Sequence, residues 1–384
     1  MAHRLTIPGT TYIGENALAD ALADISALGK HALIVSGNSM KKAGHLEMLT
    51  ARLQESGVSS TVFSGITGEP TDIMVENGTA LYRECGADFI IGFGGGSQLD
   101  AAKAIGILAS NPGSISDCCC KPIPASLPPL VAIPTTSGTG SEATDVTIIT
   151  DTANDVKMLI KNRLLMPDIA VVDAIYSMNA PESVKVATGL DALTHAIEAY
   201  TSVKAFPESD IFALSAVKRI FSFLPAAVAD GTDKNARTQM AMAAYEAGIS
   251  FCNSSVTVVH GMSRPIGAIF HVPHGISNAM LLDECMKYVV SGAYDRFAGL
   301  ARAIGVAGNT TDDIHAASSF IDAVSEICKV CSVPSFREYG IDEDRYFSSI
   351  EKMSSDAIES GSPANTRMPL SKEDISTIYK NAWK

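Results

Sequence analysis

Four residues of metal-binding type lie in two short segments of the second half of the sequence. Asp191 and His195 are four residues apart in GLDALTHAIEAY, and His260 and His274 follow within VVHGMSRPIGAIFHVPHG. A carboxylate and an imidazole at positions i and i+4 project from one face of a helix. Each residue alone is more simply explained as a hydrogen-bonded interior group. Together, one oxygen and three nitrogens suit Fe(II), Zn or Co better than Ca or Mg, and they leave room for a substrate oxygen.

A glycine-rich turn lies in the first half of the chain, between a predicted strand and a predicted helix. The strand FIIGF runs into Gly94-Gly95-Gly96-Ser97 and then into QLDAAKAIGILAS. Such a turn presents backbone N–H groups at the positive end of a helix, and glycine lets a phosphate approach closely. The spacing is not GxGxxG, and a simple chain reversal also explains the turn. Asp100, in the first turn of this helix, has a structural explanation as an N-terminal charge.

A second polar loop, residues 133–142, follows another predicted strand and reads IPTTSGTGSE. Its hydroxyls and glycines suit hydrogen bonding to a nucleotide. An elaborate polar turn explains the same residues equally well.

The two halves of the chain have different periodicities. The first half alternates amphipathic segments near residues 16–28, 46–56, 72–86 and 98–110 with short apolar runs at residues 32–35, 61–63, 89–93, 130–133 and 169–172. Continuous apolar strands separated by helices predict a parallel sheet covered on both faces. After Pro181 the strand signals nearly vanish, and residues 183–384 read as successive helices. We therefore expect an α/β domain with a parallel sheet at residues 1–180 and an all-α domain, which contains the four candidate ligands, at residues 181–384.

Composition narrows the class of protein. The chain has 384 residues, 46% of them hydrophobic and 18% charged, which is typical of a compact globular protein. A net charge of −13 argues against nucleic acid and anionic membranes as partners. The N-terminal segment does not resemble a signal peptide, and no apolar run approaches the roughly 18 residues of a membrane helix. We expect a cytoplasmic protein.

Eight cysteines fit that compartment as reduced thiols. Cys85, Cys252 and Cys285 lie in apolar patterns and are expected to be small buried side chains. The CxxC at residues 328–331 has no partner pair, so a redox or zinc role is not favoured. The run at residues 118–120 is either an accident of a variable loop or a reactive lining of a cleft.

Taken together, GGGSQLDAAKAI, PTTSGTGSEAT, GLDALTHAIEAY and HGMSRPIGAIFHVPHG resemble the iron-containing (group III) alcohol dehydrogenase family, in the family's order and spacing. The resemblance covers essentially the whole chain. It implies a dinucleotide-binding α/β domain at residues 1–180, a helical metal-binding, catalytic domain at residues 181–384 and an active site in the cleft between them. It also implies iron or zinc and NAD(H) or NADP(H) as cofactors. The positions that match the family's metal ligands are Asp191, His195, His260 and His274. Those that match its nucleotide-binding residues are Gly95, Gly96, Ser97, Asp100, Thr135, Thr136, Thr139 and Lys157, the last against the nicotinamide ribose.

The sequence departs from the family where the adenosine ribose would bind. NAD-preferring members commonly place an aspartate after the second strand, where it repels a 2′-phosphate. Here the position is Gly37, and Ser39 and Lys41 follow within reach of a phosphate. We predict that NADP(H) is accepted and even preferred, unless Gly37 only makes a turn.

A second departure is Arg264, which stands where many relatives have a proton-relaying histidine. Arginine stays protonated near neutral pH and cannot relay a proton. His271 is the obvious substitute, although water or the ribose hydroxyl would also serve. Arg264 would either bind an anionic group of the substrate through its planar guanidinium or form a structural salt bridge.

The resemblance and the residues together predict an enzyme that interconverts a small aldehyde and its primary alcohol, with an anionic aldehyde such as sulfoacetaldehyde among the candidates. Glycerol-dehydrogenase-like polyol oxidation is the alternative. A dehydroquinate-synthase-like lyase and a non-catalytic nucleotide-binding protein are less favoured. As among relatives, a homodimer or larger homo-oligomer is expected.

Overall fold

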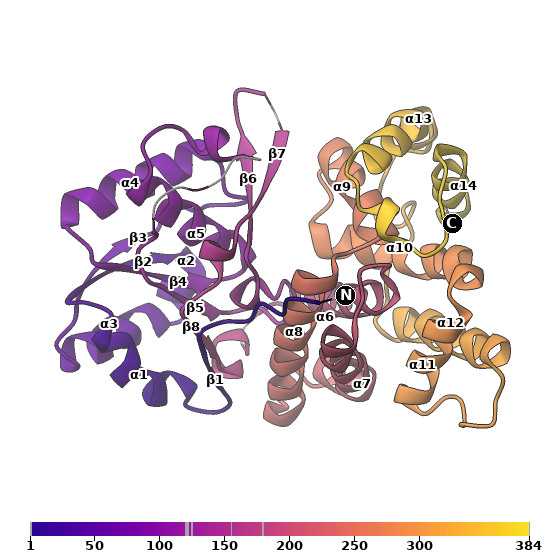
Figure 1. Cartoon of the computed structure of the whole chain (residues 1–384), viewed down its shortest axis with the longest axis horizontal. Helices are drawn as coiled ribbons and strands as arrows, with labels where there is room; N and C mark the ends of the chain where they lie inside the picture. Colours follow the sequence, from indigo (N-terminus) through magenta and orange to yellow (C-terminus); the bar gives the residue numbers. More distant parts are fainter. Residues whose placement is uncertain (1, 120–122, 124–125, 155, 179, 384) are drawn as a thin grey trace. The chain divides into compact units, whose positions relative to one another are not determined.

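The computed structural model describes residues 2–119, 123, 126–154, 156–178 and 180–383. The chain divides into two compact units, one of residues Thr6–Ala180 and one of Met1–Leu5 with Pro181–Lys384 (Figure 1). The first unit contains a parallel sheet with helices, and the described part of the second is helical, which confirms the predicted fold class. An active site in a cleft between the units stays a prediction.

The sheet of the first unit has six parallel strands in the order β1-β8-β5-β4-β2-β3. Five of them are the predicted strands: β2 (His31–Ser36), β3 (Ser59–Phe63), β4 (Phe89–Gly94), β5 (Leu130–Pro134) and β8 (Ile169–Val172). The sixth, β1 (Thr10–Ile13), pairs with β8 at the edge and was not expected from the sequence. The order of the strands reverses between β2 and β4, and in such sheets a ligand binds at the carboxyl ends of strands beside this point.

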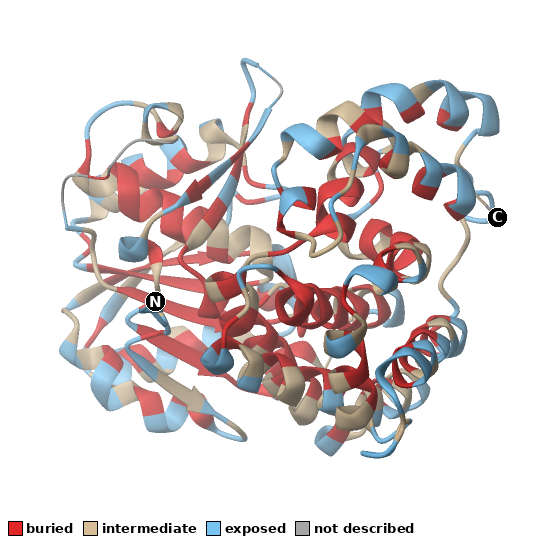
Figure 2. Ribbon diagram, turned by 45° about the vertical axis from the view of Figure 1, so that its right-hand side comes forward, coloured by how far each residue is buried: buried red, intermediate tan, exposed pale blue. Residues whose placement is uncertain are grey.

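Helices cover both faces of this sheet (Figure 1). Alternate residues of β2 show this: Ala32 and Ile34 belong to one apolar cluster, and Leu33 and Val35 to another. The first cluster includes residues of α1 (Ala17–Ala27) and α3 (His45–Glu55), and the second includes residues of α4 (Asp72–Cys85) and α5 (Gly96–Ser110). Figure 2 shows the strands buried and the outer sides of the helices exposed. The short helix α2 (Asn38–Lys42) follows β2.

A separate antiparallel pair, β6 (Val146–Asp151) and β7 (Val156–Lys161), was also not expected from the sequence. Ile149, Met158 and Ile160 of this pair are buried in the cluster with α4 and α5. Ile148 and Leu159 are paired on the opposite face and are exposed. The pair therefore follows the alternation of a half-buried hairpin.

The helical unit is built from α6 to α14, with one continuous apolar core. The helices are α6 (Glu182–Thr201), α7 (Pro207–Ala229), α8 (Lys234–Ser254), α9 (Val258–Phe270), α10 (His274–Val289), α11 (Tyr294–Ile304), α12 (Asp313–Val330), α13 (Glu343–Glu359) and α14 (Lys372–Ala382). Short 3₁₀ turns occur at Ile115–Cys118, Ser141–Ala143, Arg163–Leu165, Ala174–Ser177, Val290–Gly292 and Pro363–Asn365.

Among the described residues, α7 alone is long and apolar enough to cross a membrane, with a mean hydropathy of 1.6 over its window. Core helices pass the same test. Val217, Ile220 and Leu224 of α7 are buried in the apolar core of the helical unit, against the neighbouring helices. Packing within the unit therefore accounts for its composition.

The cysteines of the described residues are present as thiols. Cys252 and Cys285 are buried as predicted, whereas Cys85 is only partly buried. Cys328 and Cys331 lie in the apolar core at the end of α12, and burial raises the pKa of Cys331 to about 11. A thiol with so high a pKa is a poor nucleophile. Cys120 lies outside the described residues.

Candidate metal centre

Asp191, His195, His260 and His274 converge in the helical unit, where one ligand atom from each lies within 4.8 Å of the others. Asp191 Oδ1 is 3.7 Å from His260 Nε2 and 3.8 Å from His274 Nε2, and its Oδ2 is 4.0 Å from His195 Nδ1. Asp191, His195 and His260 are buried, but 42% of the His274 side chain is exposed. The four side chains thus form one compact set that is open on the side of His274.

Three helices carry these side chains. Asp191 and His195 lie one turn apart on α6, His260 is on α9, and His274 is the first residue of α10. The glycine after each of the last two histidines allows close packing. A Cβ on Gly261 would lie 2.7 Å from Pro363 Cδ, and a Cβ on Gly275 would lie 2.7 Å from the carbonyl oxygen of Ala187 on α6. Both HG pairs therefore have a steric reason in addition to the histidine.

The amide of Asn278 lies at the centre of this set. Its Nδ2 donates to Asp191 Oδ1 at 2.7 Å and lies 3.1 Å from His260 Nε2 and 3.2 Å from His274 Nε2. An electropositive N–H group thus occupies the point toward which three ligand atoms face. The buried Asn278 Oδ1 and His195 Nδ1 have no hydrogen-bond partner among the described residues. Buried acceptors without a donor beside four ligand atoms fit a bound cation, and the ligand set fits a divalent transition metal.

Metal binding requires neutral imidazoles and an ionised carboxylate, and the protonation of His195 and Asp191 meets this requirement. Burial lowers the pKa of His195 to about 3, so this ring is neutral. It stacks on Phe251, with ring centres 4.2 Å apart, and on His260 at 4.4 Å. Burial opposes ionisation of Asp191, yet the surrounding imidazoles hold the pKa of its carboxyl below the usual value. Burial alone would lower the pKa of His260, but Glu198 and Asp191 raise it to about 8.

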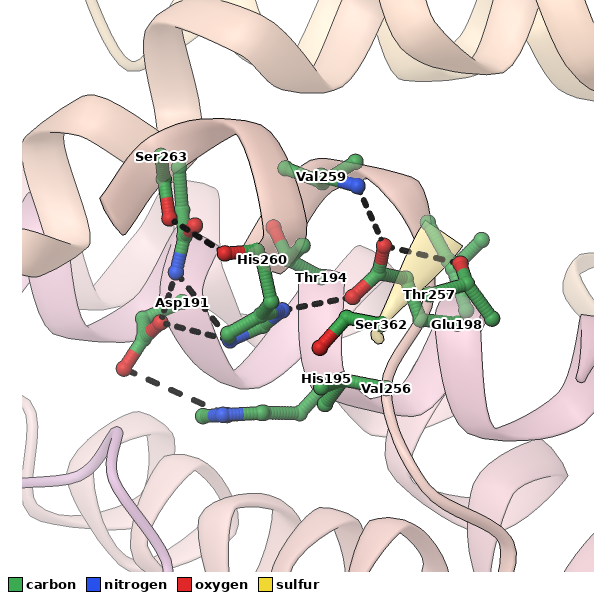
Figure 3. A network of polar contacts seen from close by, with 12 residues as sticks. Asp191, Thr194, His195, Glu198, Val256, Thr257, Val259, His260, Ser263 and Ser362 are labelled. Atoms are coloured by element: carbon green, nitrogen blue, oxygen red, sulfur yellow. Dashed lines mark hydrogen bonds and ion pairs between the residues drawn. The ribbon is translucent and has the colours of Figure 1, made fainter. Parts of the chain in front are cut away.

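Glu198 is a fully buried carboxylate that was not expected from the sequence. It lies on α6, one turn beyond His195, and its Oε2 is 2.5 Å from His260 Nδ1 (Figure 3). Its Oε1 accepts from the Val259 N–H at 2.6 Å and from Thr257 Oγ1 at 2.8 Å. A helix-face count from Asp191 could have found it, because residues i, i+4 and i+7 share a face.

Arg264 lies on the same helix as His260, and His271 directly follows the end of that helix. Arg264 is four residues after His260, is partly buried, and its Nη1 donates to Ser362 Oγ at 3.2 Å. Burial lowers the pKa of its guanidinium. His271 ends α9 with a left-handed φ of 56° and is exposed. Among the described contacts, the predicted structural salt bridge of Arg264 is replaced by this hydrogen bond to a neutral hydroxyl.

The two predicted nucleotide loops lie side by side in the α/β unit. Gly95 alone separates β4 from α5, as the strand–glycine–helix prediction requires. A Cβ on Gly95 would lie 3.4 Å from Thr136 Cγ2, and a Cβ on Gly96 would lie 2.9 Å from Thr139 Cγ2. The Thr135 N–H donates to the Gly94 carbonyl at 2.9 Å. The first turn of α5, with Gly96 and Ser97, also leaves N–H groups without intrahelical acceptors.

A buried lysine, which the sequence did not single out, ties the second loop to α5. Lys103 Nζ donates to five oxygens at 2.7 to 3.1 Å. They are the carbonyl and hydroxyl oxygens of Ser141 and of Thr144, and the carbonyl oxygen of Val146. Asp100 accepts from Ser141 Oγ at 2.7 Å and from the Ile148 N–H at 3.1 Å. Its carboxylate therefore holds the second loop and β6, which agrees with a structural explanation of this residue.

The remaining predicted nucleotide contacts are the turn at Gly37, with Ser39 and Lys41 after it, and Lys157 on β7. A Cβ on Gly37, after β2, would lie 3.2 Å from Gln98 Nε2 in α5, so this turn adjoins the glycine loop. Ser39 and Lys41 follow it on α2 and are exposed. Lys157, on β7, pairs with Glu69 at 2.7 Å and is exposed.

Comparison with known proteins covers both units. Residues 8–174 match the protein-family model described as "Iron-containing alcohol dehydrogenase". Residues 185–383 match the model described as "Fe-containing alcohol dehydrogenase family, C-terminal". The chain is 34% identical to the NAD-dependent methanol dehydrogenase of Bacillus methanolicus, over 98% of either protein. It is also 34% identical to the NADPH-dependent butanol dehydrogenase of Clostridium saccharobutylicum, over 98% of this chain and 97% of the relative. The solved structure of a 1,3-propanediol oxidoreductase matches it with a TM-score of 0.96 and 30% identity, over 100% of both chains.

Proposed function

Because this chain belongs to the iron-containing alcohol dehydrogenase family, we propose that it interconverts a small aldehyde and its primary alcohol with a nicotinamide nucleotide. Membership makes it an oxidoreductase that acts on CH–OH donors, rather than a lyase or a non-catalytic nucleotide-binding protein. The observation that carries the finer proposal is the convergence of Asp191, His195, His260 and His274 in one compact set.

The four side chains would hold a divalent metal, iron or zinc, and the surroundings would prepare them for it. When bound, the metal supplies a Lewis acid for the carbonyl oxygen, and the nicotinamide supplies or accepts the hydride. Asp191 brings the only negative charge among the four ligands. His195 is neutral, as a ligand must be. The exposed side of His274 would leave room for the substrate.

The pyrophosphate of the cofactor would lie at the start of α5, on Gly95, Gly96 and Ser97. The neighbouring Thr135, Thr136 and Thr139 would bind the nucleotide through hydroxyls. Support comes from the position of these loops beside the point where the strand order reverses. In this proposal Asp100 acts indirectly, by holding Ser141. Lys157 would reach the nicotinamide ribose only after leaving Glu69, which costs little because exposed ion pairs are weak.

NADP(H) would be accepted because no carboxylate follows β2, where Gly37 precedes the exposed Ser39 and Lys41. Relatives named as NAD-dependent and as NADPH-dependent are equally similar to this chain. The test compares kcat/KM for both cofactors. A preference for NADH above about a hundredfold, or about 2.7 kcal/mol, would contradict the proposal. A Gly37→Asp variant should shift the preference toward NADH.

Arg264 would bind an anionic group of the substrate, and His271 would relay the proton of the alcohol. Support for Arg264 is its place one helical turn after His260, with Ser362 as its one side-chain hydrogen-bond partner among the described residues. Arg264→Met should raise KM for sulfoacetaldehyde at least about tenfold, since a charge-assisted hydrogen bond contributes about 1.5–3 kcal/mol, and should leave propionaldehyde nearly unaffected. Equal losses with both aldehydes would contradict a substrate role.

The central experiment assays metal-analysed protein with a panel of small aldehydes, anionic ones included, with glycerol, and with both cofactors. His274→Ala should lose metal and turnover together. His315→Ala, at an exposed histidine on α12, is the matched control and should keep both. Full turnover after metal removal, or in the His274→Ala variant, would refute the proposal. A clear preference for glycerol would favour the polyol alternative.

The chain is also proposed to form a homodimer or larger homo-oligomer in the cytoplasm. Strand β1 ends the sheet, and Ile13 at its end is 40% exposed. Exposed sheet edges favour pairing with another chain. Light scattering of the purified protein tests this, and a monomer would contradict it.

A further inference from the structure

We propose that Glu198 is a positioning residue of the metal centre, which fixes the tautomer of His260 so that the Nε2 lone pair faces the other ligands. The inference rests on the proposed metal site and adds a residue outside its four ligands. Glu198 itself would not touch the metal or the substrate. It would act only through His260.

The contact between the two residues determines where the ring proton lies. Glu198 Oε2 is 2.5 Å from His260 Nδ1, and an ionised carboxylate can only accept hydrogen bonds (Figure 3). Nδ1 must therefore carry the proton, which leaves Nε2 as the acceptor in the neutral ring. The opposite side of the ring agrees, because the amide donor Asn278 Nδ2 lies 3.1 Å from Nε2.

The carboxylate is held firmly in this place. Its other oxygen accepts from the Val259 N–H at 2.6 Å and from Thr257 Oγ1 at 2.8 Å, both at the start of α9. A helix N-terminus stabilises a negative charge, and this favours the ionised form of the fully buried Glu198. Burial opposes ionisation of this carboxyl, but the His260 imidazole and the hydrogen bonds hold its pKa below the usual value. The same residue thus joins α6 to the start of the helix that carries His260.

A purely structural role would explain the contacts with Thr257 and Val259 but not the third contact, which uses a proposed ligand. Carboxylates behind metal-binding histidines orient the ring and raise its basicity, and their loss typically lowers metal affinity 10- to 100-fold. The two explanations therefore differ in what a neutral replacement does to metal binding.

The test is a Glu198→Gln variant. The glutamine carbonyl can still accept from Val259 and Thr257, but its amide would donate to His260 Nδ1. The ring proton would then move to Nε2, where it blocks metal binding. We expect zinc affinity, measured by competition with a chelator, to fall about 10- to 100-fold. The melting temperature of the metal-free protein should change only slightly.

Two matched variants separate the tautomer effect from general damage. Glu246→Gln removes a partly buried carboxylate of α8 that pairs with Arg219, and it should leave zinc affinity within about threefold. Thr257→Val removes one donor to Glu198 but leaves the contact between Glu198 and His260 in place. This variant should lower the free energy of unfolding and should leave zinc affinity nearly unchanged.

A Glu198→Gln variant that binds zinc as tightly as the wild type would overturn the inference. Should that variant not fold, side-chain NMR of the zinc-loaded wild type decides instead: a protonated Nδ1 on His260 supports the proposal, and a protonated Nε2 refutes it. Failure of the wild type to bind zinc or iron at all would instead refute the proposed metal function, so the two failures are distinguishable.

Discussion

The buried side chain of Glu142 should make the stability of the α/β unit depend on pH. Glu142 is 1% exposed in the short turn Ser141–Ala143 of the second nucleotide loop. Its Oε2 has no hydrogen-bond partner among the described residues. Burial raises the pKa of its carboxyl to about 7, although the nearby Lys103 opposes the change. Replacing it with glutamine keeps the shape of the protonated acid and removes the ionisation.

The magnitude follows from the two pKa values. The pKa of Glu142 is 4.5 unfolded and about 7 folded, and the difference corresponds to about 3.4 kcal/mol. A raised folded pKa contributes stability that is complete below the unfolded pKa and is lost as pH rises through the folded one. About 2.5 kcal/mol of this should be lost between pH 5 and pH 8. The Glu142→Gln variant has no such loss.

The assay is urea unfolding of the wild type and the variant at pH 5 and pH 8. The Glu142→Gln variant should lie within about 1 kcal/mol of the wild type at pH 5 and should be more stable by about 2–3 kcal/mol at pH 8. Glu47→Gln, at an exposed carboxylate of α3, is the control and should show no such change. A difference between Glu142→Gln and wild type that is the same at both pH values would show that Glu142 is ionised in the folded state, and the reasoning from burial would fail.

Three other predictions concern the two candidate sites. Lys103→Met leaves five buried oxygens without their cation and should lower the free energy of unfolding by about 3–5 kcal/mol, as measured by urea denaturation; a loss below about 1 kcal/mol would contradict this. Gly96→Ala places a Cβ 2.9 Å from Thr139 Cγ2, so it should weaken NADH binding in a fluorescence titration and cost about 1–3 kcal/mol of stability; unchanged binding would argue against the glycine loop as a phosphate site. Because the pKa of metal-free His260 is about 8, protons compete with the metal below that value. Apparent zinc affinity should therefore fall about tenfold per pH unit below about pH 7, and a flat profile would be inconsistent with that competition.

Local periodicity in the sequence was enough to predict much of the fold. The five apolar runs of the first half are strands, and the amphipathic segments between them are helices. A strand that is buried on both faces is apolar over several consecutive residues, so the pattern can be recognised locally. Strands β1, β6 and β7 were missed. Strand β1 has only four residues at a sheet edge, and β6 and β7 have only six residues each, which is too short for their alternation to stand out.

The candidate ligands were visible in the sequence because each belongs to a short motif. Asp191 and His195 share a helix face by spacing alone. The sequence could not show that His260 and His274 meet them, since this depends on the packing of three helices and on the close approaches at Gly261 and Gly275.

The supporting residues were decided by tertiary structure. Glu198 and His260 are 62 positions apart, and Lys103 reaches oxygens at least 38 positions away. Glutamate and lysine are most often solvated surface residues, and only their complete burial reveals that each must have a partner. Local patterns in the sequence were enough for most of the elements and for the chemical types of the ligands, because neighbours along a helix or strand set those. Only the folded chain decided which charges lie behind them, because such contacts join residues that no local pattern relates.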